Sequence, residues 1–80
     1  MKKYEILIDG KASNSYVRGR INGMIFVLTG MPEVSFGYAK SKDGVEWVMC
    51  YVATEEQHKA VVECLEKHYP KAFVGWKEVE

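Results

Sequence analysis

The chain has 80 residues, of which 48% are hydrophobic, 12% aromatic and 28% charged, and its formal net charge is zero. This length fits a single domain over residues 1–80, and the composition is too apolar for a disordered chain. Nucleic-acid binders usually carry an excess of basic residues, so we do not expect DNA or RNA as the partner. No apolar run reaches roughly 18 residues, so no transmembrane helix and no membrane partner are predicted.

The cysteine count and the start of the chain indicate a cytoplasmic protein. Cys50 and Cys64 are too few for a disulfide scaffold and do not form a C-x-x-C pair. Residues 1–6 lack the apolar core of a signal peptide. A reducing, cytoplasmic setting is therefore predicted.

Residues 3–9 are predicted to form a strand, because Tyr4, Ile6 and Ile8 alternate with polar side chains. The next segment, 13–30, has two interpretations. Apolar residues recur at helical spacing, with a capping residue before them and a glycine after them, which favours a helix. Asn22-Gly23 between apolar runs indicates a two-stranded hairpin instead. We favour the helix, with Ser13 or Asn14 as its N-cap and Gly30 at its C-terminal end. Its apolar stripe consists of Val17, Ile21, Met24, Ile25 and Leu28.

The remaining elements are a hairpin, a helix and a last strand. Strands over 34–40 and 45–53 are joined by a turn at 41–44, a register that places Lys40 opposite Glu46. A helix over 54–69 is marked by a capping box, in which Thr54 and Gln57 cap each other's backbone, and by the stop at Pro70. Residues 72–79 are predicted to form the last strand.

This order predicts a two-layer α+β fold of the ferredoxin-like β-α-β-β-α-β type, with two helices on one face of an antiparallel sheet. If residues 16–29 form a hairpin, the alternative is a mostly-β meander with one helix at 54–69.

The sheet face that the helices leave uncovered is predicted to be hydrophobic, and contiguous exposed apolar patches usually mark interaction sites. We therefore expect a small non-catalytic module that binds or occludes a protein target or a second copy of itself as a homodimer. A phage- or mobile-element-type inhibitor or regulator is one such protein. The residues predicted to form this surface are Trp47, Met49 and Tyr51 with Leu7, and Phe36 and Tyr38 form the alternate face.

An anion site is the alternative function. Residues 10–32 contain three basic residues and no acidic one, and glycine-rich backbone next to basic side chains can cradle an anion. The site would bind an anion, a nucleotide or a nucleic acid through Lys11, Arg18 and Arg20 beside Gly19 and Gly23.

Metal binding and nucleophilic catalysis find little support. The spacing of Cys50, His58, Cys64 and His68 matches no metal-site pattern. Cys64 and His68 are a local nucleophile–base pair, but no carboxylate is placed to orient the imidazole. We predict no metal, no cofactor and no catalytic residue, so the chain is not expected to be an enzyme.

Two short segments nevertheless resemble acylphosphatases. The run from Val17 to Phe26 (VRGRINGMIF) is similar to that family's phosphate-cradle signature, and Gly37–Lys40 followed by Asp43–Glu46 is similar to a later Gly-Trp…Asp-Gly segment. The resemblance implies a β-α-β-β-α-β fold and a phosphate-binding loop. In this alignment the family's catalytic arginine falls on Val27 and its catalytic asparagine near Ser41, so both groups are replaced and hydrolysis of acyl phosphates is not expected.

Overall fold

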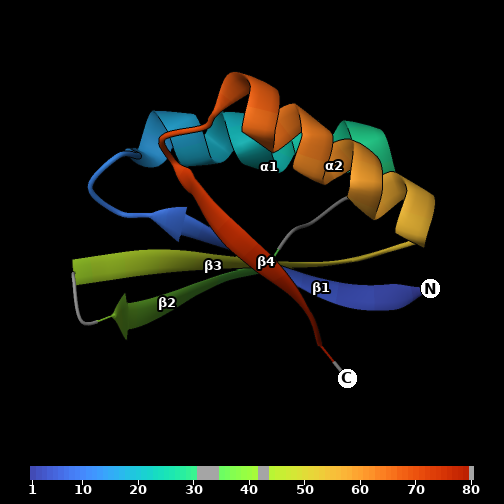
Figure 1. The fold of residues 1–80 in the computed structure, drawn as a ribbon, viewed down its shortest axis with the longest axis horizontal. Coiled ribbons are helices and arrows are strands. Elements are labelled where there is room, and N and C mark those ends of the chain that lie inside the picture. The colour runs from blue at the N-terminus through green and yellow to red at the C-terminus, as the bar shows by residue number, and fades with distance from the viewer. Residues whose placement is uncertain (31–34, 42–43, 80) are drawn as a thin grey trace.

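A computed structural model describes residues 1–30, 35–41 and 44–79 of the chain, with side chains in 1–30 and 47–79. The two helices lie side by side over one face of the sheet, and no described helix covers the other face (Figure 1). Within these residues no helix is long and apolar enough to cross a membrane. The elements in chain order are β1 (Lys2–Asp9), α1 (Ser15–Thr29), β2 (Ser35–Ser41), β3 (Gly44–Ala53), α2 (Glu55–His68) and β4 (Phe73–Val79).

The strands form one sheet in the order β2-β3-β1-β4, in which all neighbours are antiparallel. The first strand, β1, lies between β3 and β4. Its pairing with β4 has an irregularity between Leu7 and Ile8. The order and the two layers are those of the ferredoxin-like class predicted from the sequence.

The helical interpretation of residues 13–30 is confirmed, and the mostly-β alternative is wrong. Asn14 is the N-cap of α1 and accepts a hydrogen bond from the backbone N–H of Val17 at 2.9 Å. The helix ends at Gly30, whose φ of 72° lies in the left-handed region that glycine adopts without strain. Two internal glycines disfavour the helix by about 1 kcal/mol each, and burial of Ile21 and Ile25 against the sheet offsets that cost.

The capping box that the sequence predicts at the start of α2 is confirmed. Thr54 Oγ1 accepts from the backbone N–H of Gln57 at 3.2 Å, and Gln57 Oε1 accepts from the N–H of Thr54 at 2.9 Å. The face of this helix that meets the sheet carries Val61 and Leu65 and also the polar residue His58.

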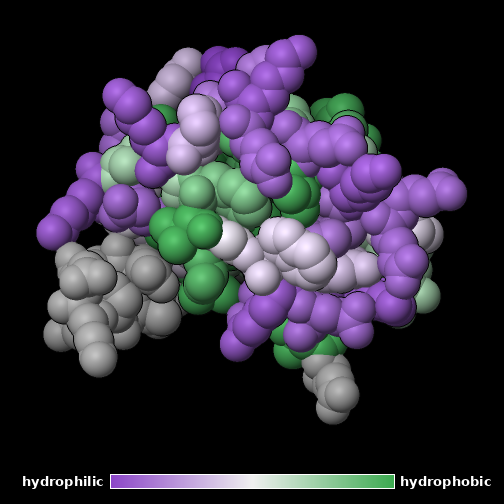
Figure 2. Space-filling model, in the orientation of Figure 1, coloured by the Kyte–Doolittle hydropathy of each residue, from purple (hydrophilic) through white to green (hydrophobic). Residues whose placement is uncertain are grey.

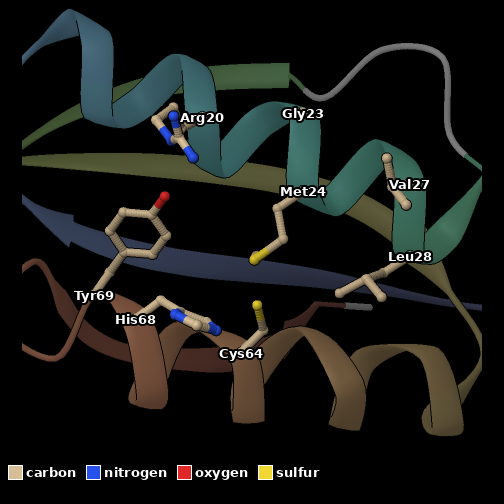
Figure 3. A pocket seen from close by; sticks show the side chains of 8 residues that line it. All are labelled: Arg20, Gly23, Met24, Val27, Leu28, Cys64, His68 and Tyr69. Atoms are coloured by element: carbon tan, nitrogen blue, oxygen red, sulfur yellow. The ribbon is translucent and has the colours of Figure 1, made fainter.

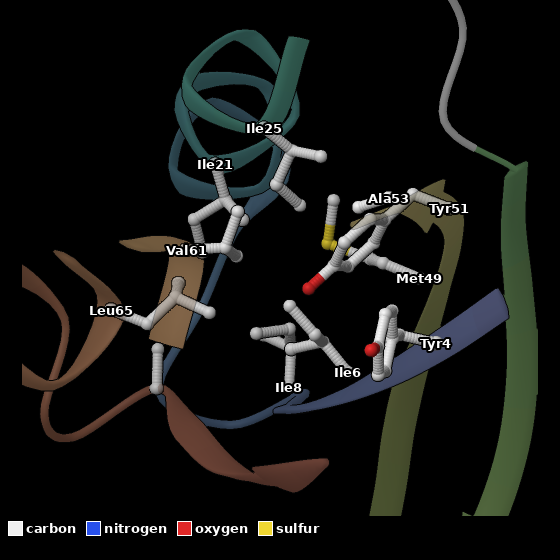
Figure 4. Close-up of a cluster of buried hydrophobic side chains, with 11 residues drawn as sticks. Tyr4, Ile6, Ile8, Ile21, Ile25, Met49, Tyr51, Ala53, Val61 and Leu65 are labelled. Carbon is white, nitrogen blue, oxygen red and sulfur yellow. The ribbon is translucent and has the colours of Figure 1, made fainter. Parts of the chain in front are cut away.

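The core lies between the helices and the sheet, and the side chains of both layers meet there (Figure 4). Hydrophobic side chains also reach the surface along the seam between helices and sheet, bordered by hydrophilic ones (Figure 2). Alternation along β1 behaves as predicted, because Tyr4, Ile6 and Ile8 are buried. The buried hydrophobic residues are Tyr4, Ile6, Ile8, Ile21, Ile25, Met49, Tyr51, Ala53, Val61, Leu65 and Ala72.

The predicted register of the β2–β3 hairpin is wrong by one residue. The strands extend to Ser41 and Gly44, which pair with each other, so Glu46 is opposite Ala39 rather than Lys40. A shift of one residue in register exchanges the faces on which paired residues lie. Phe36 and Tyr38 are therefore paired with Met49 and Trp47, residues that the sequence analysis assigned to the opposite face.

Candidate functional site

The loop over residues 10–14 joins β1 directly to the N-terminus of α1, and three hydrogen bonds fix its shape. The Asp9 carboxylate accepts from the backbone N–H of Lys11 at 2.8 Å, and the Ser13 hydroxyl donates to the Asp9 carbonyl at 2.7 Å. At the end of the loop, the Asn14 side chain caps the N-terminus of α1. A short loop held at both ends is a preorganised surface for a ligand.

The N-terminus of α1, which is the positive end of the helix dipole, adjoins this loop. The first four N–H groups of a helix have no intrahelical partner, and the helix dipole adds partial positive charge there. Asn14 satisfies the N–H of Val17 with its side chain and that of Arg18 with its carbonyl. No acidic residue lies in the first turn. Within the part of the chain that the structure describes, the amides of Ser15 and Tyr16 make no hydrogen bond and are available to an anion.

Arg18 is the side chain that connects this loop to the sheet. Its guanidinium carbon lies 4.1 Å from the ring centroid of Trp47, a cation–π contact. Its Nη1 donates to the carbonyl of Ser13 at 3.4 Å. Trp47 is opposite Ile8, next to the end of β1, so the guanidinium is held at the point where β1 enters the loop. These two contacts restrict an otherwise flexible cation beside the positive end of α1.

Among the side chains that the structure describes around this loop, charge favours an anion, with one opposing group. Lys11 is exposed on the loop and Arg18 is half-buried behind it. The carboxylate of Asp9 is the acidic group in the loop's own hydrogen bonds, where the amide of Lys11 binds one of its oxygens. The two cations outnumber it, and the helix end adds to them.

The other residues of the predicted anion site do not belong to it. Gly19 and Gly23 lie inside α1, where their backbone N–H groups are committed to the helix, and a Cβ at either position would meet nothing within 4 Å. Arg20 points away from the loop and donates to the Tyr16 hydroxyl at 3.0 Å. A phosphate cradle at 17–26 is therefore wrong, since a helix interior offers an anion no free amides.

A groove of about 640 Å³ separates the outer surfaces of α1 and α2. Its floor is largely apolar, and the sulfur ends of Met24 and Cys64 point toward each other across it (Figure 3). Arg20 and Gly23, two residues of the predicted anion site, line this groove instead. The complete lining is Arg20, Gly23, Met24, Val27, Leu28, Cys64, His68 and Tyr69.

The predicted protein-binding surface is wrong in its main residues. Met49 is 0% and Tyr51 is 2% exposed, because the β3 face that carries them is the one that the helices cover. Trp47 lies under Arg18 and packs against the core. The side chains of Phe36 and Tyr38 lie outside the described residues.

Leu7 does lie on the sheet face without helices, as predicted. Its register neighbours there are Val48 and Gly75, and Val48, Cys50 and Val52 are partly exposed on the same face. Binding of a protein or of a second copy through this face stays a prediction. Among the described residues, no three His, Cys, Asp or Glu side chains lie close enough to hold a metal.

The buried His58 is the polar residue that the sequence analysis weighed only as a metal ligand and did not place in the core. The spacing of His58, Val61 and Leu65 on one helix face was the available signal. Its ring stacks on Tyr4, with centroids 3.7 Å apart, and its Nδ1 is hydrogen-bonded to the hydroxyl of Tyr51. Burial lowers the pKa of His58 and so favours the neutral ring.

No protein-family model matches the sequence, and no curated protein matches it. Among solved structures, the chain is similar to the crystal structure of acylphosphatase from Bacillus subtilis. The two have 15% sequence identity and a TM-score of 0.58, and the alignment covers 99% of this chain and 83% of the other. At this identity the similarity shows the fold and leaves the activity to be tested.

The prediction that this chain is not an enzyme is contradicted by this similarity, because the fold is that of a protein named as an enzyme. That prediction was drawn from the lack of a metal-site pattern and of an oriented nucleophile–base pair, and the acylphosphatase resemblance did not change it because its cradle was aligned inside what proves to be α1. The chain has an acylphosphatase-like, ferredoxin-type fold.

Proposed function

We propose that this protein binds a phosphate-like oxyanion at the loop over residues 10–14 and hydrolyses acyl phosphates there. The observation that carries the proposal is the position of Arg18, whose guanidinium is held beside the loop by Trp47 and Ser13. The similarity to acylphosphatase from Bacillus subtilis supports the substrate class.

The structure also changes how the acylphosphatase resemblance aligns with this chain. The sequence alignment started the glycine loop at Gly19, so the family's catalytic arginine fell eight residues later, on Val27. In the structure the loop that follows the first strand starts at Gly10. Moving the alignment nine residues toward the N-terminus places Gly10 in the position of Gly19 and Arg18 in that of Val27. The arginine that the first alignment lacked is then present.

The arrangement suits a tetrahedral oxyanion on chemical grounds. A guanidinium presents paired N–H donors that match two phosphate oxygens, and charge-assisted hydrogen bonds of this kind are the strongest in proteins. The free amides of Ser15 and Tyr16 supply two further donors at the positive end of α1. Lys11 adds an exposed positive charge on the loop.

Hydrolysis of an acyl phosphate needs charge stabilisation more than covalent chemistry. Water adds to phosphorus, the bond from phosphorus to the carboxylate oxygen breaks, and the carboxylate leaves. Arg18 and the helix amides would stabilise the charge on the phosphoryl oxygens during this step. The family's asparagine position remains near Ser41, the last residue of β2, whose side chain lies outside the described residues. A serine in that position predicts slower turnover than the asparagine gives.

The test compares Arg18→Gln with Arg20→Gln. Both changes remove one guanidinium from the same helix, but only Arg18 lies beside the loop, since Arg20 is bound to Tyr16. Benzoyl phosphate hydrolysis, followed by ultraviolet absorbance, should fall by roughly 10- to 100-fold in Arg18→Gln and stay within about twofold in Arg20→Gln.

A second measurement separates binding from catalysis. Inorganic phosphate, titrated into 15N-labelled protein, should shift the backbone amide signals of Ser15 and Tyr16 and should do so much less in Arg18→Gln. Phosphate binding without hydrolysis would keep the anion site and remove the enzymatic part of the proposal. Equal effects of the two arginine substitutions, or no amide shifts, would overturn the site itself.

A further inference from the structure

A second site is indicated at the opposite end of β1 from the loop, around the buried His58. His58 is 5% exposed and its two ring nitrogens have different surroundings. Nδ1 is hydrogen-bonded to the hydroxyl of Tyr51, whereas Nε2 is buried and has no hydrogen-bond partner among the described residues. A buried nitrogen without a partner loses its bonds to water and gains none in return, so it requires an explanation.

The proton on the imidazole can be assigned by counting unsatisfied groups. If the Tyr51 hydroxyl donates to Nδ1, the proton of the ring is on Nε2, and one buried donor lacks a partner. If Nδ1 donates instead, both the hydroxyl proton of Tyr51 and the lone pair of Nε2 lack partners. The first arrangement leaves fewer groups unsatisfied, so Nε2 carries the proton and is a buried donor with no acceptor among the described residues.

A pocket of about 420 Å³ adjoins this ring. Its walls are aromatic, since Tyr4 stacks on His58 and Trp76 meets the same imidazole edge-on with centroids 4.3 Å apart. Trp76 is 47% exposed, so it forms the outer wall of the pocket and faces solvent on its other side. The complete lining is Tyr4, Glu55, His58, Lys59, Val62, Glu63, Trp76 and Glu78.

The rim of the pocket is acidic and partly neutralised. Lys2 Nζ lies 2.5 Å from Glu55 and 3.3 Å from Glu78, so one ammonium bridges two of the rim carboxylates. Glu63 and Lys59 add one charge of each sign. A rim of three carboxylates repels an anion, and the ammonium of Lys2 already occupies the position that a cationic ligand would seek.

We infer that this pocket binds an uncharged, planar aromatic molecule that carries a carbonyl or ring-nitrogen acceptor. The acceptor of the ligand accepts a hydrogen bond from His58 Nε2, and the aromatic ring of the ligand packs against Trp76. In the structure Nε2 is shielded from solvent, so the ligand reaches it by displacing the half-exposed indole of Trp76 outward. The site is separate from the loop at 10–14 and does not depend on the proposed hydrolysis.

The test uses three probes of similar size and shape that differ in one property each. Benzamide is neutral and has a carbonyl acceptor, benzoate replaces the amide with a carboxylate, and toluene has no acceptor. Binding is followed by the 15N signal of His58 Nε2 and by the indole N–H signal of Trp76. We expect benzamide to shift both signals and to bind at least tenfold more tightly than either benzoate or toluene.

Two substitutions on β4 locate the site. Trp76→Ala should weaken benzamide binding at least fivefold, whereas Val74→Ala, at a similarly exposed position of the same strand, should leave it unchanged. Both positions are exposed, so neither variant is expected to unfold. The inference is wrong if toluene or benzoate binds as tightly as benzamide, if the two alanine variants bind alike, or if benzamide leaves the His58 signal unmoved up to its solubility limit.

Discussion

Removing one oxygen atom from Tyr51 should measurably destabilise the fold. The Tyr51 hydroxyl is the hydrogen-bond partner of His58 Nδ1, and the two residues are 2% and 5% exposed. Tyr51→Phe keeps the ring and nearly all its packing but leaves a neutral imidazole with no partner at either nitrogen within the described residues. The variant therefore isolates the energy of one buried hydrogen bond.

The expected loss follows from the cost of a buried unsatisfied polar group, about 1–3 kcal/mol. In urea, a small domain loses stability by about 1 kcal/mol per molar denaturant, so the unfolding midpoint should fall by roughly 1–3 M. The slope of the transition should not change, because the same surface is exposed on unfolding.

The matched control is Tyr4→Phe. Tyr4 is also 2% exposed and its ring stacks on the same imidazole at 3.7 Å, but its hydroxyl makes no hydrogen bond within the described residues. Phenylalanine preserves the stacking, so this change should cost less than about 0.5 kcal/mol. Equal losses in the two variants, measured by urea unfolding, would refute the assignment of the Tyr51–His58 hydrogen bond.

Three further predictions concern stability. Thr54→Ala removes the hydrogen bond from the N–H of Gln57 and should cost about 1 kcal/mol in urea unfolding. Gly30→Ala should cost about 1 kcal/mol because of its φ of 72°, whereas Gly23→Ala, inside a helix with free space around it, should stabilise by up to about 1 kcal/mol. Burial, opposed by Glu78, lowers the pKa of His58 below 6.5, so the folded protein binds a proton less readily than the unfolded chain. Stability should then be full above about pH 6.5 and fall as the pH drops toward the folded pKa, and His58→Gln should lose that slope in thermal unfolding at pH 7.5 and 5.5.

Periodicity and end signals were sufficient to predict the elements. Two signals that span only a few residues are confirmed by the structure. They are the alternation of buried residues at Tyr4, Ile6 and Ile8 and the capping box at Thr54. The ambiguity at Asn22-Gly23 was decided by tertiary packing, since burial of one helix face outweighs the preference of this dipeptide for turns.

Relations between distant segments were the part that the sequence could not supply. The face that Met49 and Tyr51 occupy is set by the pairing of β3 with the distant strand β1, where they are opposite buried residues. A single residue of register in the β2–β3 hairpin decides whether Phe36 and Tyr38 share that face, and no local signal distinguished the two registers. The contact of Arg18 with Trp47 joins segments far apart in the chain. Without it, the basic residues of 10–23 looked equivalent, and the resemblance to acylphosphatases was aligned on Gly19, which lies inside α1.

The position of β1 inside the sheet has a consequence for folding kinetics. This strand pairs with β3 through Lys2↔Ala53 and with β4 through Lys3↔Val79, so both of its neighbours come from much later in the chain. The entropy of closing these long loops is lost before the pairings stabilise anything, which slows folding relative to helical proteins of the same size. During synthesis, one edge of β1 therefore stays unpaired until the ribosome has released β4, the strand that ends at Val79.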